Sequence, residues 1–224
     1  MLFENKYQNV IIFDCETTGL NLAADRVVEI ACCKLSLVSG DYSVTDQFDK
    51  LINIHQPLPT RIIELTGISN QMITENGIEE KAVVSEFYLR FLSESGNSLF
   101  IAYNAPFDIG FIGAMLSRNG LSFPRNPSFL DALTVYKDRA PYPHRLENAI
   151  KHYNLEQIAT NSHRAICDVM ATYEVLKAMN LEKDDLHRYV NLFGYNPNYP
   201  IRNRIDGVKY RPQPYGSKQA LYEK

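Results

Sequence analysis

Three strand-like segments follow one another with no helical segment between them, and this order constrains the fold more than any other feature. They lie at residues 10–13, 27–35 and 47–54, and the connections between them are short enough for antiparallel pairing. Farther along, helical and strand patterns alternate, with helices expected at 80–92, 107–118, 146–153 and 163–179 and strands at 99–102 and 128–131. We therefore predict an α/β fold in which helices cover a mixed sheet whose first three strands are antiparallel.

The composition is that of an ordinary globular protein, with 45% apolar and 22% charged residues among 224. It fits one large domain, or a domain with an appendage, and excludes the disordered, collagen-like and coiled-coil classes. No segment approaches the ~20 apolar residues that span a membrane, and the first residues lack the pattern of a signal peptide. The four cysteines show neither zinc-ligand spacing nor a disulfide framework. We therefore expect no membrane partner and a reducing, cytoplasmic location.

Charge divides the chain near residue 187. Residues 187–224 hold seven basic and two acidic side chains, a net charge of +5, and since the whole chain carries −3, residues 1–186 carry −8. Turn- and loop-like runs rich in Tyr and Pro occupy 196–200 and 211–216. We predict a domain at 1–186 and a basic, Tyr/Pro-rich extension at 187–224. The extension would guide single-stranded nucleic acid, dock on another protein or cover an edge of the domain, and its charge is equally consistent with chance.

Two carboxylates stand at the end of the first strand. Asp14 and Glu16 alternate with Cys15, so both acids point to one face of the strand and Cys15 to the other. Like charges held side by side repel, and a divalent cation removes that conflict; hard oxygen ligands favour Mg²⁺ or Mn²⁺ over zinc. An ordinary turn explains the same residues, since acids and a glycine such as Gly19 are common where strands end.

Two later segments contribute further polar side chains. Asp108 follows Asn104 where an apolar strand passes into a helix. Such a junction often carries the functional site of a sheet protein. An acid at this position is also explained without any function, because a negative charge stabilises a helix N-terminus. Asp168 falls on a helical stripe of mostly small or apolar residues, which is expected to face the protein interior. A carboxylate on such a face needs a charged or hydrogen-bonding partner, and His163, in or before the first turn, is able to reach the same place. Taken alone, each of these segments is explained equally well by a structural role, such as a turn or a helix N-terminus, and by a role in a functional site. Together, four carboxylates and a histidine match a two-metal site, which needs oxygen ligands and one titratable base.

These segments resemble the three exonuclease motifs of the DEDDh (DnaQ-like) 3'–5' exonuclease family, nearest to the DNA polymerase III epsilon-subunit type. The matching segments are 13–20, 103–108 and 163–168, with further likeness at 65–68 and 130–133. The resemblance covers roughly residues 9–179. Tyr103 departs from it, because many relatives have histidine at that position. The resemblance implies a ribonuclease H-like fold with a five-stranded mixed sheet flanked by helices.

The resemblance also implies metal and catalytic roles. Asp14 would bridge two divalent ions, Mg²⁺ or Mn²⁺, while Glu16 and Asp168 would complete one ion site and Asp108 would anchor the other. His163 would take the proton of the attacking water. The reaction implied is metal-dependent hydrolysis that releases nucleoside 5'-monophosphates from the 3' ends of DNA.

Contacts with the substrate follow from the same resemblance. The residues expected to bind the terminal nucleotides are Thr17, Thr18, Leu20, Thr66, Asn104 and Phe107, joined by Leu65 and Ile68 in the base pocket. Thr17 and Thr18 would offer backbone N–H groups, and Leu20 would wedge against the last base. Core packing explains the apolar members of this set equally well. Asp131 is a fifth acid, expected to hold a backbone group or support a ligand rather than bind metal.

Three functions are consistent with these residues. The first is a DNA 3'–5' exonuclease with a proofreading or repair role, acting on a single-stranded or frayed 3' end, with a DNA polymerase as a further partner. The second is an RNA 3'-end trimming enzyme like ribonuclease T or oligoribonuclease, because the acids of such a site do not distinguish the two sugars. The third is a non-catalytic nucleic-acid-binding module, which is disfavoured because all five key residues are present.

Overall fold

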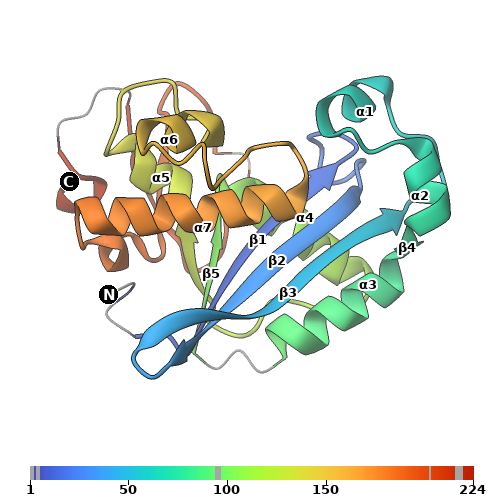
Figure 1. Cartoon of the computed structure of the whole chain (residues 1–224), viewed down its shortest axis with the longest axis horizontal. Coiled ribbons are helices and arrows are strands. Elements are labelled where there is room, and N and C mark those ends of the chain that lie inside the picture. Colours follow the sequence, from blue (N-terminus) through green and yellow to red (C-terminus); the bar gives the residue numbers. More distant parts are fainter. Residues whose placement is uncertain (1–2, 4–5, 94–96, 202, 215–218) are drawn as a thin grey trace.

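The computed structural model describes the whole chain except residues 1–2, 4–5, 94–96, 202 and 215–218. Its main sheet has six strands in the order β4-β3-β2-β1-β5-β6 (Figure 1). The strands of the chain are β1 Asn9–Thr17, β2 Val27–Val38, β3 Asp41–Asn53, β4 Ile78–Glu79, β5 Ser98–Ala102, β6 Ser128–Asp131, β7 Leu192–Tyr195 and β8 Lys209–Pro212. β1, β2 and β3 pair antiparallel, whereas β4, β5 and β6 join their neighbours in parallel. The predicted mixed sheet with an antiparallel start is confirmed. The expected count of five strands is wrong by one, because β4 has two residues and leaves no pattern in the sequence.

Helices cover both faces of this sheet (Figure 1). They are α1 Thr60–Thr66, α2 Asn70–Asn76, α3 Glu80–Phe87, α4 Ala105–Arg118, α5 Ala132–Lys137, α6 Leu146–His152 and α7 Ala165–Glu182, with a π-helical turn at Tyr88–Leu92 and 3-10 turns at Leu186–Tyr189 and Leu221–Glu223. The four expected helices correspond to α3 with its π turn, α4, α6 and α7. The sequence pattern missed α1, α2 and α5, which have six or seven residues, although α6 was recognised at the same length. Among the described helices, none combines the length and the apolar character needed to cross a membrane.

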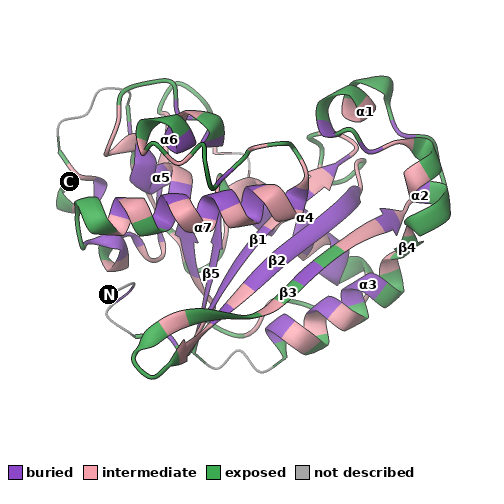
Figure 2. Ribbon diagram, in the orientation of Figure 1, coloured by how far each residue is buried: buried purple, intermediate pink, exposed green. Residues whose placement is uncertain are grey.

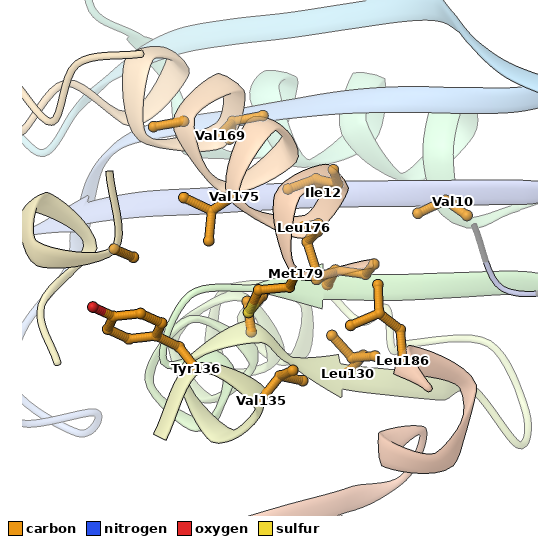
Figure 3. Packing of buried hydrophobic residues seen from close by; sticks show 14 of the residues in the cluster. Val10, Ile12, Leu130, Val135, Tyr136, Val169, Val175, Leu176, Met179 and Leu186 are labelled. Carbon is orange, nitrogen blue, oxygen red and sulfur yellow. The ribbon is translucent and has the colours of Figure 1, made fainter. Parts of the chain in front are cut away.

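The alternation of β1 separates two apolar cores. Val10 and Ile12 point to the face covered by α7, where they pack with residues such as Val175 and Met179 (Figure 3). Ile11 and Phe13 belong to the second cluster, which includes buried side chains of α3 and α4. β2, next to β1, is buried along most of its length (Figure 2). Because side chains alternate along a strand, the two acids that follow Ile12 at even positions also face α7.

The described part of the C-terminal extension packs on the domain. Asn191 pairs with Phe129 at the edge strand β6: its N–H donates to the Phe129 carbonyl at 2.7 Å, and its side chain accepts from the Phe129 N–H at 2.7 Å. Phe193 of β7 is buried in the second core cluster. Gln213 donates to the carbonyl of Thr134 in α5 at 2.9 Å. β7 and β8 pair in parallel as a small sheet of four-residue strands. β7 lies outside the two runs predicted as turn- and loop-like, and β8 overlaps the second of them only at residues 211–212. Residues 202 and 215–218 of the predicted extension lie outside the described residues.

Candidate active site

A cleft of about 680 Å³ lies beside the ends of β1 and β5 and the beginnings of α4 and α7. Its lining contains every side chain to which the sequence assigned a metal or catalytic role: Asp14, Glu16, Asp108, His163 and Asp168. These residues come from three segments that are distant in the sequence. The topology of the sheet therefore brings all five together in one cleft.

Three of these groups approach one another closely. One ligand atom each from Glu16, His163 and Asp168 lies within 4.8 Å of the others, a spacing suited to a shared metal ion. Asn161 donates from its side-chain amide to Asp168 Oδ2 at 2.7 Å. The other oxygen, Asp168 Oδ1, is buried and has no hydrogen-bond partner among the described residues. Because a buried carboxylate oxygen normally has a partner, this atom is a candidate metal ligand.

The fourth carboxylate is held from β1. Asp108 Oδ1 accepts from the backbone N–H of Cys15 at 3.0 Å and from its thiol at 3.4 Å. Asp108 lies in the first turn of α4, and the start of this helix is fixed by Asp131, whose Oδ1 accepts from the backbone N–H groups of Asn104 and Ala105, each at 3.0 Å. Asn104 adopts a left-handed backbone with φ 73°, which is uncommon for residues other than glycine. Asp131 thus holds backbone groups and stabilises the turn that presents Asp108.

The acids of the cleft share one electrostatic property, a pKa above the ordinary value of a carboxyl group. Burial first, and then the charges of Asp108 and Asp168, raise the pKa of Asp14 well above its usual range. Burial, with the charges of Asp168 and Glu29, raises the pKa of Glu16 to about 8.

The remaining two acids show the same direction. Burial raises the pKa of Asp108 to about 7, although the hydrogen bonds from Cys15 oppose the change. Burial likewise raises the pKa of Asp168 to about 7 against the hydrogen bond from Asn161. Burial, together with the repulsion among the acids, makes the full negative charge costly in the metal-free protein, so the cleft favours a cation that neutralises it.

Most of the residues expected to bind the terminal nucleotides also line the cleft: Thr17, Thr18, Leu20, Leu65, Asn104 and Phe107. Leu20 is 73% exposed, and core packing therefore does not explain it. The backbone N–H of Thr18, expected to be offered to the terminal nucleotide, donates to the carbonyl of Arg26 at 2.9 Å in this structure. Its hydroxyl donates to Asp25 Oδ1 at 2.9 Å and so also has a partner.

Two of the expected substrate contacts do not reach the cleft. Thr66 is 2% exposed; its hydroxyl donates to the carbonyl of Ile62 at 2.8 Å and accepts from the N–H of Ile68 at 3.1 Å. Ile68 is fully buried in a small cluster with Val28. Both residues stabilise the end of α1, whose other residues Ile62 and Leu65 face the cleft.

The sequence reasoning missed several residues beside the cleft. Arg61, Lys137 and Arg145 line it and add positive charge around the acids. Arg61 and Lys137 lie in short helices that leave no clear pattern, and Arg145 precedes α6 at a position to which the sequence assigns no role. Glu29 of β2, paired in register with Glu16 of β1, is fully buried. A detectable signal was present for Glu29, since a lone acid inside an apolar strand needs a charged or hydrogen-bonding partner.

Comparison with protein families and curated proteins gives consistent matches. Residues 11–176 match the family RNase_T, described as exonuclease. A PolC-type DNA polymerase III of Bacillus cereus is 36% identical over 181 residues, which are 80% of this chain and 12% of that protein. The PolC-type DNA polymerase III of Bacillus subtilis is 33% identical over 177 residues, 77% of this chain and 11% of that protein. The chain thus spans about a tenth of the length of the curated relatives it matches.

Solved structures show the same fold. Exonuclease I of E. coli in complex with single-stranded DNA superposes with a TM-score of 0.70 and 21% identity, covering 81% of this chain and 42% of that one. A further structure of exonuclease I gives a TM-score of 0.70 over 81% of this chain and 43% of that one.

Proposed function

The chain belongs to the RNase_T exonuclease family, and from this premise we propose that it is a 3'–5' exonuclease which releases nucleoside 5'-monophosphates from single-stranded or frayed 3' ends of DNA. The observation that carries the proposal is the meeting of Glu16, His163 and Asp168 within 4.8 Å in a cleft that also contains Asp14 and Asp108. We assign the catalytic domain to residues 1–186, with 187–224 as an extension packed on it.

The carboxylates of the cleft fit two divalent cations. Their oxygens are hard ligands suited to Mg²⁺ or Mn²⁺, and the buried Asp168 Oδ1 has no other partner among the described residues. In the proposal the carboxylates of Asp14, Glu16, Asp108 and Asp168 would hold these ions. The chemistry that such ions supply is stabilisation of charge on the attacking and leaving oxygens of the phosphodiester.

His163 is the proposed general base. It is exposed at the cleft, in the loop before α7, and its ring reaches the carboxylates of Glu16 and Asp168. The imidazole side chain is suited to take a proton near neutral pH, and its position beside the carboxylates directs it toward a water attacking the terminal phosphodiester. The neighbouring carboxylates would then stabilise the imidazolium ion that forms.

The substrate contacts in the proposal come from the remaining cleft residues. Leu20 would lie against the last base, Asn104 and Phe107 would contact the terminal nucleotides, and exposed Arg61 and Arg145 would attract the phosphates of the strand. The likeness to PolC-type polymerases supports a role at a DNA 3' end with a polymerase as partner. The likeness to exonuclease I, which was captured with single-stranded DNA, supports the single-stranded form of the substrate.

The experiment uses 5'-labelled single strands of DNA and RNA of the same sequence, incubated with Mg²⁺ or Mn²⁺. A ladder that shortens from the 3' end, and that is absent for the variant Asp14→Ala/Glu16→Ala, is the expected result. The faster substrate distinguishes DNA proofreading or repair from RNA trimming. Absence of a ladder on both strands contradicts the proposal and favours a nucleic-acid-binding module.

A further inference from the structure

Glu29 is a buried carboxylate beside the cleft to which the proposed reaction assigns no role. It has no exposed surface, and it stands opposite Glu16 in the β1–β2 register. A buried acid next to other acids adds repulsion unless a cation compensates it. The Glu29 carboxylate therefore needs a positively charged or hydrogen-bonding partner, and the identity of that partner indicates the role of Glu29.

That partner is the N-terminal end of α7. Glu29 Oε1 accepts from Arg164 Nε at 2.8 Å and from Arg164 Nη2 at 2.6 Å, and Oε2 accepts from the backbone N–H of Ala165 at 2.8 Å. The carboxylate thus binds both the side chain before the helix and the first N–H of the helix itself, which otherwise lacks an intrahelical partner. Both oxygens are used, so the geometry of this end of α7 is fixed to the sheet.

The residue immediately before Arg164 is His163. Its backbone lies in the left-handed region with φ 53°, a conformation that is uncommon for residues other than glycine and that the surrounding contacts support. On the other side of this turn, Asn161 binds the carboxylate of Asp168 at 2.7 Å. The turn is therefore tied to α7 through Asn161 and to β2 through Arg164, and His163 stands between the two ties.

We propose that buried Glu29 and half-buried Arg164 form a clamp that positions the His163 ring beside Glu16 and Asp168. The inference rests on the proposed function, since it assigns positioning residues to the same hydrolysis. Neither residue touches the substrate in this account. The clamp acts by holding the turn at His163 in its left-handed conformation.

The test compares Glu29→Gln and Arg164→Lys with a matched control, Asp46→Asn. Glutamine keeps the size of Glu29 but is uncharged and replaces one acceptor oxygen with an amide NH2 group, which only donates. Lysine keeps the charge of Arg164 but not its paired donors. Asp46 accepts from Arg90 Nε at 3.1 Å in a similar ion pair between β3 and the π turn, outside the lining of the cleft. The measurements are kcat and KM on labelled single-stranded DNA with Mn²⁺, and the NMR signal of the His163 ring, assigned by its loss in His163→Gln.

Loss of a group that orients a functional side chain typically lowers activity by about 10- to 100-fold. We expect that decrease in kcat for Glu29→Gln, with KM within about twofold, a smaller decrease for Arg164→Lys, and a shifted His163 signal in both. Asp46→Asn should change none of these. If the wild type cuts DNA while both clamp variants keep kcat and the His163 signal, the clamp is refuted. If the wild type cuts no strand, the proposed function fails. The clamp is then tested by the His163 signal alone: a shift of that signal in the two clamp variants supports the clamp, and an unchanged signal overturns it. Should Glu29→Gln not fold, Arg164→Lys carries the comparison.

Discussion

Replacing Glu16 with glutamine should stabilise the metal-free protein, and the gain should grow with pH. Burial and the charges of Asp168 and Glu29 raise the pKa of Glu16 from 4.5 to about 8. Between these two values the folded state keeps a proton that the unfolded state has released, so the free energy of unfolding falls as the pH rises through this window. Glutamine keeps the size of the side chain and does not ionise.

The magnitude follows from the two pKa values. The full change from 4.5 to about 8 corresponds to about 4.8 kcal/mol of free energy of unfolding. Glu16 is partly exposed to water in the cleft, which screens the repulsion, so we expect ~2 kcal/mol at pH 9. For a chain of this size that gain raises the Tm by about 4–8 °C. At pH 4.5 and below, the difference should vanish.

The assay is thermal unfolding in EDTA at pH 4.5, 6, 7.5 and 9, with Glu156→Gln, an exposed position, as the matched control. The control should show no pH-dependent gain. Saturating Mn²⁺ should reverse the order and make the wild type more stable, because the ion binds only the folded site. A gain for Glu16→Gln that is the same at every pH, or a loss at pH 9, refutes the electrostatic reasoning.

Three further predictions follow from the same cleft. Asp131→Ala should lower the free energy of unfolding by about 2–3 kcal/mol, because buried N–H groups at the start of α4 lose their acceptor; urea denaturation measures the change, and a loss under about 0.5 kcal/mol contradicts it. Mn²⁺ affinity should rise between pH 6 and pH 8, because Glu16 and Asp168 must release protons to bind the ion and their pKa values are about 8 and about 7. Calorimetry at both pH values tests this, and equal affinities would count against it. Leu20→Ala should leave the Tm unchanged and raise KM for single-stranded DNA roughly fivefold, the equivalent of about 1 kcal/mol of lost apolar contact; unchanged KM would remove Leu20 from the substrate contacts.

The main strands and the long helices could be predicted from the sequence, because each leaves a clear run or stripe of apolar residues. The apolar run before Asp14 predicted a buried strand, and its alternation correctly placed Asp14 and Glu16 on one face. The stripe around Asp168 predicted a helix facing the protein, and α7 covers the sheet in that way. Short elements escaped detection, since β4 has two residues and α1 has seven.

The detailed contacts of the site could not be read from the sequence, because they depend on which backbone groups are already paired. Thr18 follows the acids of β1 as expected, yet its N–H is paired with Arg26 across the turn. Thr66 lies in the segment expected to line the base pocket, but the end of α1 turns its hydroxyl inward. Glu29 lies 135 residues from Arg164, and only the three-dimensional structure joins them.

The central claim is that the acid cluster at this cleft removes single nucleotides from a 3' end, and a strand labelled at its 3' terminus tests it most directly. With Mn²⁺, the account predicts that the label appears as a 5'-mononucleotide, that EDTA abolishes its release and that Asp168→Asn lowers it by orders of magnitude. A label that stays on the strand, or that leaves within a longer oligonucleotide, would contradict the account.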